Sequence, residues 1–280
     1  MENSESIKKI VKEKYGEIAL QSKTVSESSC CGTGSCTGVD YSVFAEDYSK
    51  LQGYNPDADL GLGCGLPTEF ALIKKGDTVL DLGSGAGNDA FVARAITGEK
   101  GTVIGIDFTD EMINKSRENA EKLGFNNVAF RFGDIEKMPV TANVADVIIS
   151  NCVLNLVPDK VKAFKEIYRV LKPGGHFSVS DIVATGELPQ SIKSGAELYA
   201  GCVSGAIEKS EYLGIIEDTG FVNLKIQKER VIEIPDEIYL KFISDDELKK
   251  FKESGVNLVS INVYADKPET SCEPGMGCCN

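Results

Sequence analysis

The stretch Val79-Leu80-Asp81-Leu82-Gly83-Ser84-Gly85-Ala86-Gly87 decides how this chain is expected to fold. Its apolar first half is typical of a short buried strand over 78–82, and a segment with the apolar spacing of a helix opens at Asn88. Glycines between a strand and a helix let the backbone turn tightly and come close to a ligand. The segment therefore predicts a strand, a loop that binds a small molecule, and a helix.

The same alternation of strands and helices continues as far as residue 183. Apolar runs predict further strands over 102–107, 127–132, 144–151 and 176–183, and helical spacing predicts helices over 88–96, 110–123 and 160–171. Strands that alternate with helices form βαβ units and a parallel sheet. The predicted fold class is therefore α/β, with a Rossmann-like sheet.

The segments that flank this alternation have a different composition. An amphipathic helix over 5–20 precedes Cys- and Gly-rich loops, which form an N-terminal helix and loop extension. After the sheet, helices over 189–200 and 208–219 and strands over 221–234 and 257–267 indicate an α+β C-terminal domain. The predicted regions are 1–66 for the extension, 67–185 for the ligand-binding domain, 186–267 for the C-terminal domain and 268–280 for a Cys-rich tail.

Charge and hydropathy limit the partners that this chain is expected to have. The net charge is −13, so the surface should repel both nucleic acid and anionic membranes. The charged N-terminal segment does not look like a signal peptide, and no run approaches the roughly 18 apolar residues of a membrane helix. We expect a cytoplasmic monomer that acts on a neutral or cationic small molecule.

The glycine motif favours S-adenosylmethionine over a dinucleotide. Gly83, Gly85 and Gly87 have the spacing GxGxG, whereas dinucleotide-binding loops have GxGxxG. Asp81 stands at the strand end, just before the first glycine. A carboxylate there would repel a pyrophosphate and attract the ammonium group of a methionine moiety.

Residues at the ends of the later strands complete the expected cofactor site. Asp107 ends the second strand about 20 residues after the motif, where an acidic side chain accepts hydrogen bonds from ribose hydroxyls. Asp134 follows the third strand and is expected to accept a hydrogen bond from the adenine amino group, with Met112 against the adenine face. Ile135 and Asn151, which follow the third strand and end the fourth, belong to the same predicted set.

The order of these features resembles the class I methyltransferase superfamily. The glycine loop, the acidic residues at 107 and 134, and the Leu-Lys-Pro-Gly-Gly stretch at 171–175 occur in that order within residues 67–183. The alternative at this point is a nucleotide-binding Rossmann domain of another kind.

The cysteines provide a second signal. There are nine: Cys30, Cys31, Cys36, Cys64, Cys152, Cys202, Cys272, Cys278 and Cys279. Their number is odd and the expected compartment is reducing, so metal binding, catalysis or redox chemistry is favoured over structural disulfides. With a single histidine in the chain, a site for a soft metal or metalloid must depend on sulfur.

Three cysteines are placed where a ligand is expected. Cys152 follows the fourth strand, and ligands of open α/β sheets bind beyond the carboxyl ends of the strands. Cys64 precedes the sheet and Cys202 follows it, and both are flanked by small residues that leave room for a bound atom. The alternative for each of them alone is a small buried apolar residue.

Residues 48–95, 150–160 and 197–206 closely resemble arsenite methyltransferases, most specifically where Asp-Leu-Gly-Leu-Gly-Cys-Gly-Leu-Pro-Thr (59–68) precedes the glycine motif. The resemblance covers most of the chain and implies that Cys64, Cys152 and Cys202 bind trivalent arsenic as thiolates. It also implies that Cys36 forms a disulfide with Cys64 during turnover. Arsenite and methylated arsenicals would then be the substrates, in arsenic detoxification, with an external thiol reductant of the thioredoxin or glutathione type. Leu62 replaces a tyrosine that some members carry.

The chemistry of arsenic agrees with this implication. Trivalent arsenic is soft and prefers thiolates, and three thiolates leave its lone pair pointing away from the sulfurs. That lone pair is the nucleophile, so no general base is required and catalysis depends largely on positioning. Methyl transfer oxidises the arsenic, and a dithiol of Cys36 and Cys64 would supply the two electrons that restore it.

Two other functions remain open. One is another small-molecule class I methyltransferase, such as a C-methyltransferase of quinone biosynthesis. The other is a thiol-based metal-binding or redox protein that retains a degenerate cofactor fold, although the core cysteines lack the paired spacing that zinc prefers. The roles of Cys30, Cys31, Cys272, Cys278 and Cys279 are not determined by the sequence.

Overall fold

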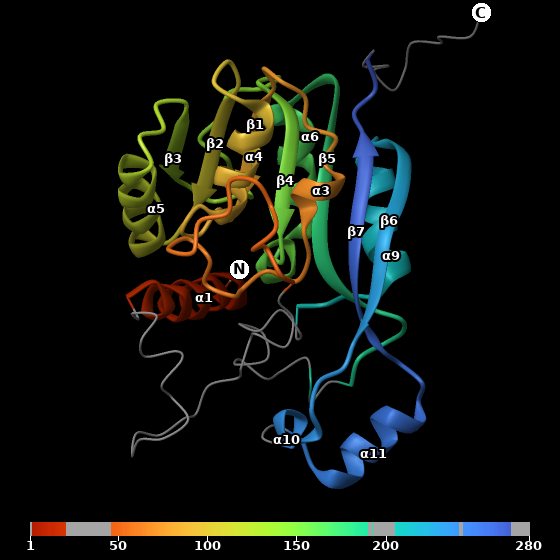
Figure 1. The fold of residues 1–280 in the computed structure, drawn as a ribbon. Helices are drawn as coiled ribbons and strands as arrows, with labels where there is room; N and C mark the ends of the chain where they lie inside the picture. Colours follow the sequence, from red (N-terminus) through yellow and green to blue (C-terminus); the bar gives the residue numbers. More distant parts are fainter. Residues whose placement is uncertain (1, 21–45, 190–191, 193–204, 241–242, 270–280) are drawn as a thin grey trace, which may run out of the picture.

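The structure is a computed structural model that describes residues 2–20, 46–189, 192, 205–240 and 243–269 (Figure 1). It contains one seven-stranded sheet in the order β3-β2-β1-β4-β5-β7-β6. The strands are β1 (Thr78–Leu82), β2 (Thr102–Asp107), β3 (Val128–Phe132), β4 (Ala145–Asn151), β5 (Leu171–Ala184), β6 (Val222–Ile232) and β7 (Leu258–Asp266).

The sheet is parallel from β3 to β5, and β7 is antiparallel to both β5 and β6. The chain runs outward from β1 through β2 to β3 and then returns to the other side of β1 with β4. The point between β1 and β4 is therefore the topological switch point, where ligands of open α/β sheets bind.

Helices cover both faces of this sheet (Figure 1). They are α1 (Glu2–Leu20), α3 (Pro67–Phe70), α4 (Asn88–Thr97), α5 (Asp110–Lys122), α6 (Lys160–Val170), α9 (Lys209–Asp218), α10 (Asp236–Tyr239), α11 (Asp245–Glu253) and the 3-10 helix η2 (Leu154–Leu156). None of the helices in the described part of the chain has the length and apolar character to cross a bilayer.

The core consists of apolar layers on the two faces of the sheet. Leu80 and Ile148 belong to the layer that contains α6 and α9, whereas Val79 and Val147 belong to the layer that contains α4 and α5. Side chains alternate between the faces of a strand, so strands that are buried on both faces are continuous apolar runs. These runs explain why β1, β2 and β4 were predicted nearly to the residue.

Helix α1 lies across the carboxyl end of the sheet, beside α5 (Figure 1). Lys12 forms an ion pair of 2.8 Å with Asp110, at the start of α5. At the far end of α1, Lys115 of α5 donates a hydrogen bond of 3.0 Å to the carbonyl of Ala19. Helix α1 is therefore attached to the edge of the sheet at which a ligand is expected.

The predicted α/β class with a Rossmann-like sheet is confirmed. Strand β5 begins at Leu171, earlier than predicted. Leu171 pairs with Ala145 of β4, and the next paired residue, His176, lies opposite Val147. The Pro-Gly-Gly stretch thus forms an irregularity within the strand. The C-terminal strands β6 and β7 join the same sheet, while the boundary at residue 186 remains a prediction. The helix predicted over 189–200 lies almost entirely outside the described residues.

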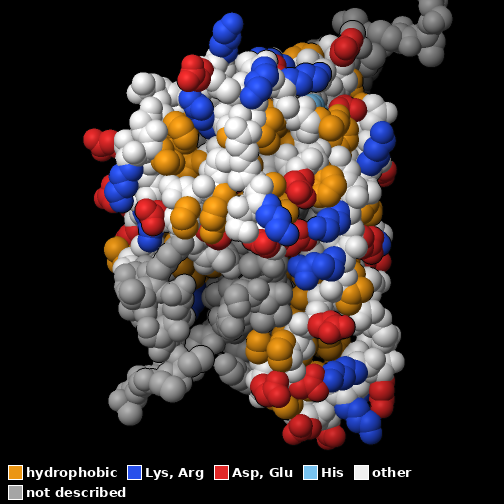
Figure 2. Space-filling model, viewed as in Figure 1, with side chains coloured by type: hydrophobic (Ala, Val, Ile, Leu, Met, Phe, Trp, Pro, Cys, Tyr) orange, Lys and Arg blue, Asp and Glu red, His pale blue; other side chains and the backbone are white. Residues whose placement is uncertain are grey.

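Two short helices, α10 and α11, were not predicted. Helix α11 has a capping box, in which Ser244 and Glu247 bond reciprocally to each other's backbone N–H groups. The sequence Ser-x-x-Glu at 244–247 is a known signal for the start of a helix and would have identified α11. Figure 2 shows acidic side chains gathered at the end of the molecule where α10 and α11 lie.

Candidate active site

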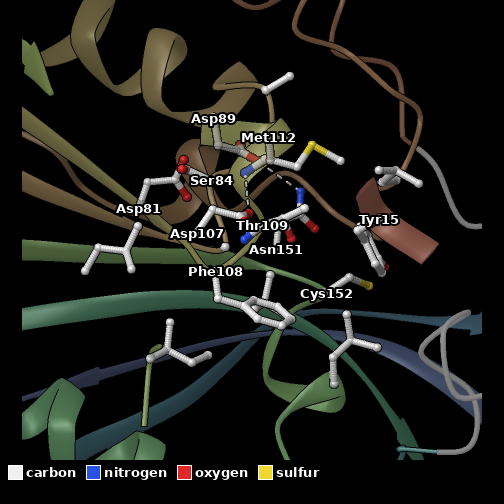
Figure 3. Close-up of a pocket in the computed structure, with 18 of the residues that line it drawn as sticks. Tyr15, Asp81, Ser84, Asp89, Asp107, Phe108, Thr109, Met112, Asn151 and Cys152 are labelled. Atoms are coloured by element: carbon white, nitrogen blue, oxygen red, sulfur yellow. Dashed lines mark hydrogen bonds between the residues drawn. The ribbon is translucent and has the colours of Figure 1, made fainter. Parts of the chain in front are cut away.

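A cleft opens beyond the carboxyl ends of β1 and β4, at the topological switch point (Figure 3). It is lined by the loop after β1, the residues that end β2 and β4, the loop after β3, and helix α1. The predicted cofactor residues that line it are Asp81, Gly83, Gly85, Asp107, Met112, Asp134, Ile135 and Asn151. The fold therefore brings eight of the nine together.

Two of the motif glycines have different structural roles. Gly83 has φ 64°, and a Cβ there would lie 2.3 Å from a methyl carbon of Val153. Only glycine therefore allows the loop to pass so close to the Val153 side chain. Gly87 has φ 101° and caps α4, and a Cβ there would collide with the rings of Phe91 and Phe130. Gly87 therefore shapes the loop from behind the cleft, whereas Gly83 lines it.

Asp81 places a buried carboxylate at the bottom of the cleft. Its Oδ2 atom has no hydrogen-bond partner among the described residues, and the same is true of Ser84 Oγ and Asn88 Oδ1 nearby in the lining. Burial, together with the negative charges of Asp89 and Asp107, raises the pKa of Asp81 well above its usual range. A buried acceptor of this kind requires a donor, and a cation is the most favourable one.

This arrangement fits the methionine end of S-adenosylmethionine. The ammonium group offers three N–H donors and a positive charge to an acidic pocket in which three oxygens, on Asp81, Ser84 and Asn88, have no partner among the described residues. When bound, S-adenosylmethionine supplies a methyl group on a positively charged sulfur, which a nucleophile can remove. The chain would hold it at Asp81 through the amino group and at Asp107 through the ribose.

Asp107 is rigidly oriented at the end of β2. Its Oδ1 accepts a hydrogen bond of 2.8 Å from the N–H of Thr109, and its Oδ2 accepts one of 3.0 Å from the N–H of Gly85. The Thr109 side chain and the Phe108 backbone also donate hydrogen bonds to this carboxyl group, which oppose the rise of its pKa caused by burial. Met112, which is buried, borders the same part of the cleft (Figure 3).

Asp134 reaches the cleft, but α1 already binds its carboxylate. Lys8 forms ion pairs of 2.6 Å with Asp134 and 2.7 Å with Glu136, and Asp134 Oδ1 also accepts from the N–H of Glu136. A role for Asp134 in binding adenine remains a prediction. The sequence reasoning did not identify Lys8, because a lysine on an amphipathic helix carries no signal for such a contact.

Two of the predicted arsenic-binding cysteines meet at the edge of the cleft. Cys64 and Cys152 are joined by a disulfide with a Cα–Cα distance of 5.8 Å. Cys152 lines the cleft, and Cys64 is fully buried behind it. The fold thus brings together a residue before β1 and a residue after β4.

The backbone at Cys152 is strained. Its φ is 57°, in the left-handed region, and its N–H donates a hydrogen bond of 2.8 Å to the carbonyl of Ser180. The left-handed conformation costs roughly 1–2 kcal/mol in a residue with a Cβ. Such strain is concentrated at functional sites, and here it falls on the cysteine that lines the cleft and is joined to Cys64.

The remaining cysteines lie outside the described residues. These are Cys30, Cys31, Cys36, Cys202, Cys272, Cys278 and Cys279. The three-thiolate arsenic site and the disulfide between Cys36 and Cys64 therefore remain predictions.

The sequence reasoning missed Tyr48 and Asp89, which form a hydrogen-bonded group with Asn151. The Tyr48 hydroxyl lies 3.0 Å from both carboxylate oxygens of Asp89, and Asn151 Nδ2 donates to Asp89 Oδ2 at 3.2 Å. Burial raises the pKa of Asp89 to about 6, although the hydrogen bonds from Asn151 and Tyr48 oppose this shift. Asp89 lies two residues after Gly87, the last glycine of the motif, and that position was the only available signal.

The sheet order, the glycine loop after β1 and the acidic residue that ends β2 define a class I S-adenosylmethionine-dependent methyltransferase. A family model described as a methyltransferase domain matches residues 73–220. An arsenite methyltransferase from Halobacterium salinarum is 38% identical, over 94% of this chain and 67% of its own length. The chain belongs to the arsenite methyltransferase family.

Two further comparisons bear on this assignment. The crystal structure of an arsenic(III) S-adenosylmethionine methyltransferase from Chlamydomonas reinhardtii aligns with a TM-score of 0.63 and 34% identity, over 77% of this chain and 69% of that one. A ubiquinone/menaquinone biosynthesis C-methyltransferase from Klebsiella pneumoniae is 37% identical, but over only 38% of this chain and 43% of its own. Our chain spans 52 to 67% of the length of the arsenite methyltransferases that it matches.

Proposed function

We propose that this chain transfers methyl groups from S-adenosylmethionine to trivalent arsenic bound by cysteine thiolates. The observation that carries the proposal is the meeting of Cys64 and Cys152 at the edge of a cleft in which the buried Asp81 Oδ2 has no hydrogen-bond partner within the described part of the chain. The cleft thus combines a pocket for a cationic amino acid moiety with soft ligands for the acceptor. The arsenite methyltransferase relatives support the same acceptor.

The residues of this chain would act mainly by positioning. Asp81 and Asp107 hold the two ends of the methyl donor, and Cys64 and Cys152, with Cys202 as third ligand by resemblance, hold the arsenic. An As–C bond forms as the S–CH3 bond breaks, and the electron pair of that bond leaves with S-adenosylhomocysteine. Because the arsenic lone pair is the nucleophile, no side chain has to remove a proton.

A thiol reductant is required before arsenic can bind in this way. Opening the Cys64–Cys152 disulfide takes two electrons and two protons, which an external thiol of the thioredoxin or glutathione type would supply. Methyl transfer oxidises arsenic to the pentavalent state, and two electrons from Cys36 and Cys64 would return it to the trivalent state as those sulfurs join. The same external thiol would then reduce that disulfide.

We propose that the protein works in the cytoplasm as a monomer, in arsenic detoxification. A reducing compartment keeps the thiolates available for arsenic. Size-exclusion chromatography with light scattering measures the mass, and a dimer would overturn the proposal of a monomer.

The test of the function is to incubate reduced protein with arsenite, S-adenosylmethionine and a thiol, and to separate the arsenic species. Methylated arsenic from the wild type, but not from Cys152→Ser, is the expected result. If the protein bound S-adenosylmethionine but produced no methylated arsenic, its methyl acceptor would be a different molecule, such as a quinone precursor. If the protein bound a metal ion stoichiometrically but did not bind S-adenosylmethionine, the result would favour the function of a thiol-based metal-binding protein.

A further inference from the structure

Asn151 immediately precedes Cys152, and its side chain contacts the backbone on both sides of Cys64. The side-chain oxygen, Oδ1, accepts a hydrogen bond of 3.0 Å from the N–H of Cys64. The side-chain nitrogen, Nδ2, donates one of 2.9 Å to the carbonyl of Gly65. One amide group thus pairs with the donor and the acceptor of this short segment, as a neighbouring strand would.

The surrounding residues determine the orientation of this amide. Nδ2 also lies 3.2 Å from Asp89 Oδ2 and within hydrogen-bond distance of the Tyr48 hydroxyl oxygen. Tyr48 is buried, and its hydroxyl is in turn bonded to Asp89. The nitrogen therefore faces the Gly65 carbonyl and the Asp89 carboxylate while the oxygen faces the N–H of Cys64, so the reversed amide would lose these three hydrogen bonds.

The loop that carries Cys64 packs too closely for other residues at its glycines. A Cβ on Gly63 would lie 2.5 Å from Asn151 Nδ2, and a Cβ on Gly65 would lie 2.6 Å from Ser180 Oγ. On the other side, Ser260 Oγ donates a hydrogen bond of 2.8 Å to the Cys64 carbonyl. Both glycines thus let the Cys64 backbone approach Asn151 and β5.

We propose that Asn151 is a positioning residue for the acceptor site. Its amide holds the Cys64 backbone beside Cys152, so that the two thiolates remain within reach of one arsenic atom after the disulfide is reduced. Tyr48 and Asp89 orient the amide. The identity of the acceptor rests on the proposed function, but the contact that holds the two cysteines together does not.

The need for such a contact follows from the sequence separation. Cys64 and Cys152 are 88 residues apart and belong to two separate loops. Without a covalent link, their effective concentration depends on how firmly these loops are held to each other. Asn151 makes this connection directly, because it lies in one loop and bonds to the backbone of the other.

The experiment measures the effective concentration of the Cys64–Cys152 thiol pair in the full-length chain. The protein is equilibrated with reduced and oxidised glutathione, free thiols are alkylated, and the disulfide is quantified by peptide mass spectrometry. We expect Asn151→Ala to lower this effective concentration at least about tenfold, since hydrogen bonds on both sides of Cys64 are lost.

The matched control is Asn127→Ala. Asn127 also bridges two backbone segments, donating to the carbonyls of Gly98 and Gly101 and accepting from Arg94, but it lies outside the cleft. It should leave the effective concentration unchanged. Equal values for the wild type, Asn151→Ala and Asn127→Ala would overturn the proposal.

A second measurement uses phenylarsine oxide, which is bound by a pair of thiols, and follows its affinity for the reduced protein. Asn151→Ala should weaken this binding about tenfold, in parallel with the effective concentration. Should Asn151→Ala fail to fold, Tyr48→Phe removes only the hydroxyl that orients the amide, and we expect it to produce a smaller loss in both measurements. If Tyr48→Phe changed neither quantity, the orienting role would be wrong.

The result is independent of whether arsenite is methylated. If the wild type failed to methylate arsenite but Asn151→Ala still lowered the effective concentration of the thiol pair, the proposed function would be wrong and the positioning role would stand. Full methylation activity with no change in the effective concentration would overturn the positioning role alone.

Discussion

Asp81 is a buried carboxylate whose Oδ2 atom lacks a partner among the described residues, and whose neighbours include the acidic Asp89 and Asp107. An empty site of this kind destabilises the folded protein, because a charge is desolvated without compensation. A bound ammonium group supplies the compensation. The Asp81 side chain should therefore lower the stability of the ligand-free protein and raise the affinity for the ligand.

Asp81→Asn should show these two effects with opposite signs. We expect a higher melting temperature without ligand and an affinity for S-adenosylhomocysteine that is about 10- to 100-fold lower, as expected for the loss of a charge-assisted hydrogen bond. Differential scanning fluorimetry and titration calorimetry measure the two quantities. Asp246→Asn, at an exposed position on α11, is the control that should change neither. A variant that melts lower and binds as tightly would contradict this role for Asp81.

Asp181 is a second buried carboxyl group, outside the cleft, that makes stability depend on pH. It accepts a hydrogen bond of 3.1 Å from the Tyr212 hydroxyl, and burial raises its pKa from 3.8 to about 7. At pH values between about 4 and about 7, Asp181 binds more protons in the folded state than in the unfolded state. The contribution of Asp181 to stability therefore falls as the pH rises from about 4 to about 7.

Asp181→Asn removes this titration and can keep the hydrogen bond to Tyr212. The melting temperature of the variant minus that of the wild type should increase between pH 4 and pH 7, on the order of 5 °C. Thermal melts across this range measure the difference. A constant difference would show that Asp181 does not titrate there.

At the scale of elements, α1 acts as a cover for the cleft. Val11 is buried, Tyr15 and Lys8 line the cleft, and Lys8 is paired with Asp134 and Glu136 after β3. These contacts place α1 over part of the cleft in which a ligand would lie. Helix α1 should therefore slow the release of the cofactor.

Val11→Asp tests this role, because it places a charge in the apolar contact beneath the helix. We expect faster hydrogen exchange within residues 4–20 and an affinity for S-adenosylhomocysteine that is about tenfold lower, which corresponds to losing the burial of one valine. Lys9→Gln, at a side chain that is 76% exposed on the same helix, is the control. Unchanged affinity despite faster exchange would show that α1 does not retain the ligand.

The elements and the site differ in how far the sequence predicts them. Buried parallel strands were predicted well because both of their faces are apolar, and the residues at their carboxyl ends meet in any such sheet. By contrast, Tyr48 and Asn151 bond across 103 residues of sequence, and nothing in the local pattern of either one indicates the other. The pairing of Cys64 with Cys152 within the described residues was not expected either, since the resemblance implied Cys36 as the partner of Cys64.

For the whole molecule, the Cys64–Cys152 disulfide connects the region before the sheet to its centre. It closes a loop with a sequence separation of 88, for which loop entropy gives a stabilisation of about 4.6 kcal/mol. Reduction should lower the melting temperature by about 10 °C. Arsenite should then restore part of this loss, because it links the same sulfurs again.

Thermal melts of oxidised protein, of reduced protein, and of reduced protein with arsenite measure this sequence of changes. Cys152→Ser is the control, because it can form neither the disulfide with Cys64 nor the thiolate bond to arsenic. We expect neither the reductant nor arsenite to change its melting temperature as they change that of the wild type. Arsenite that stabilised Cys152→Ser as much as the reduced wild type would place the acceptor elsewhere.

Asn151 recognises main-chain atoms of the Cys64 loop, and this has an evolutionary consequence. Leu60 and Leu62 of this loop line the cleft, and mutations that alter them remove no hydrogen bond between Asn151 and the backbone of Cys64 and Gly65. Any side chain at Gly63 would instead collide with the amide. We therefore expect substrate range to drift in this lineage through positions 60 and 62, while the glycine and the asparagine are inherited together.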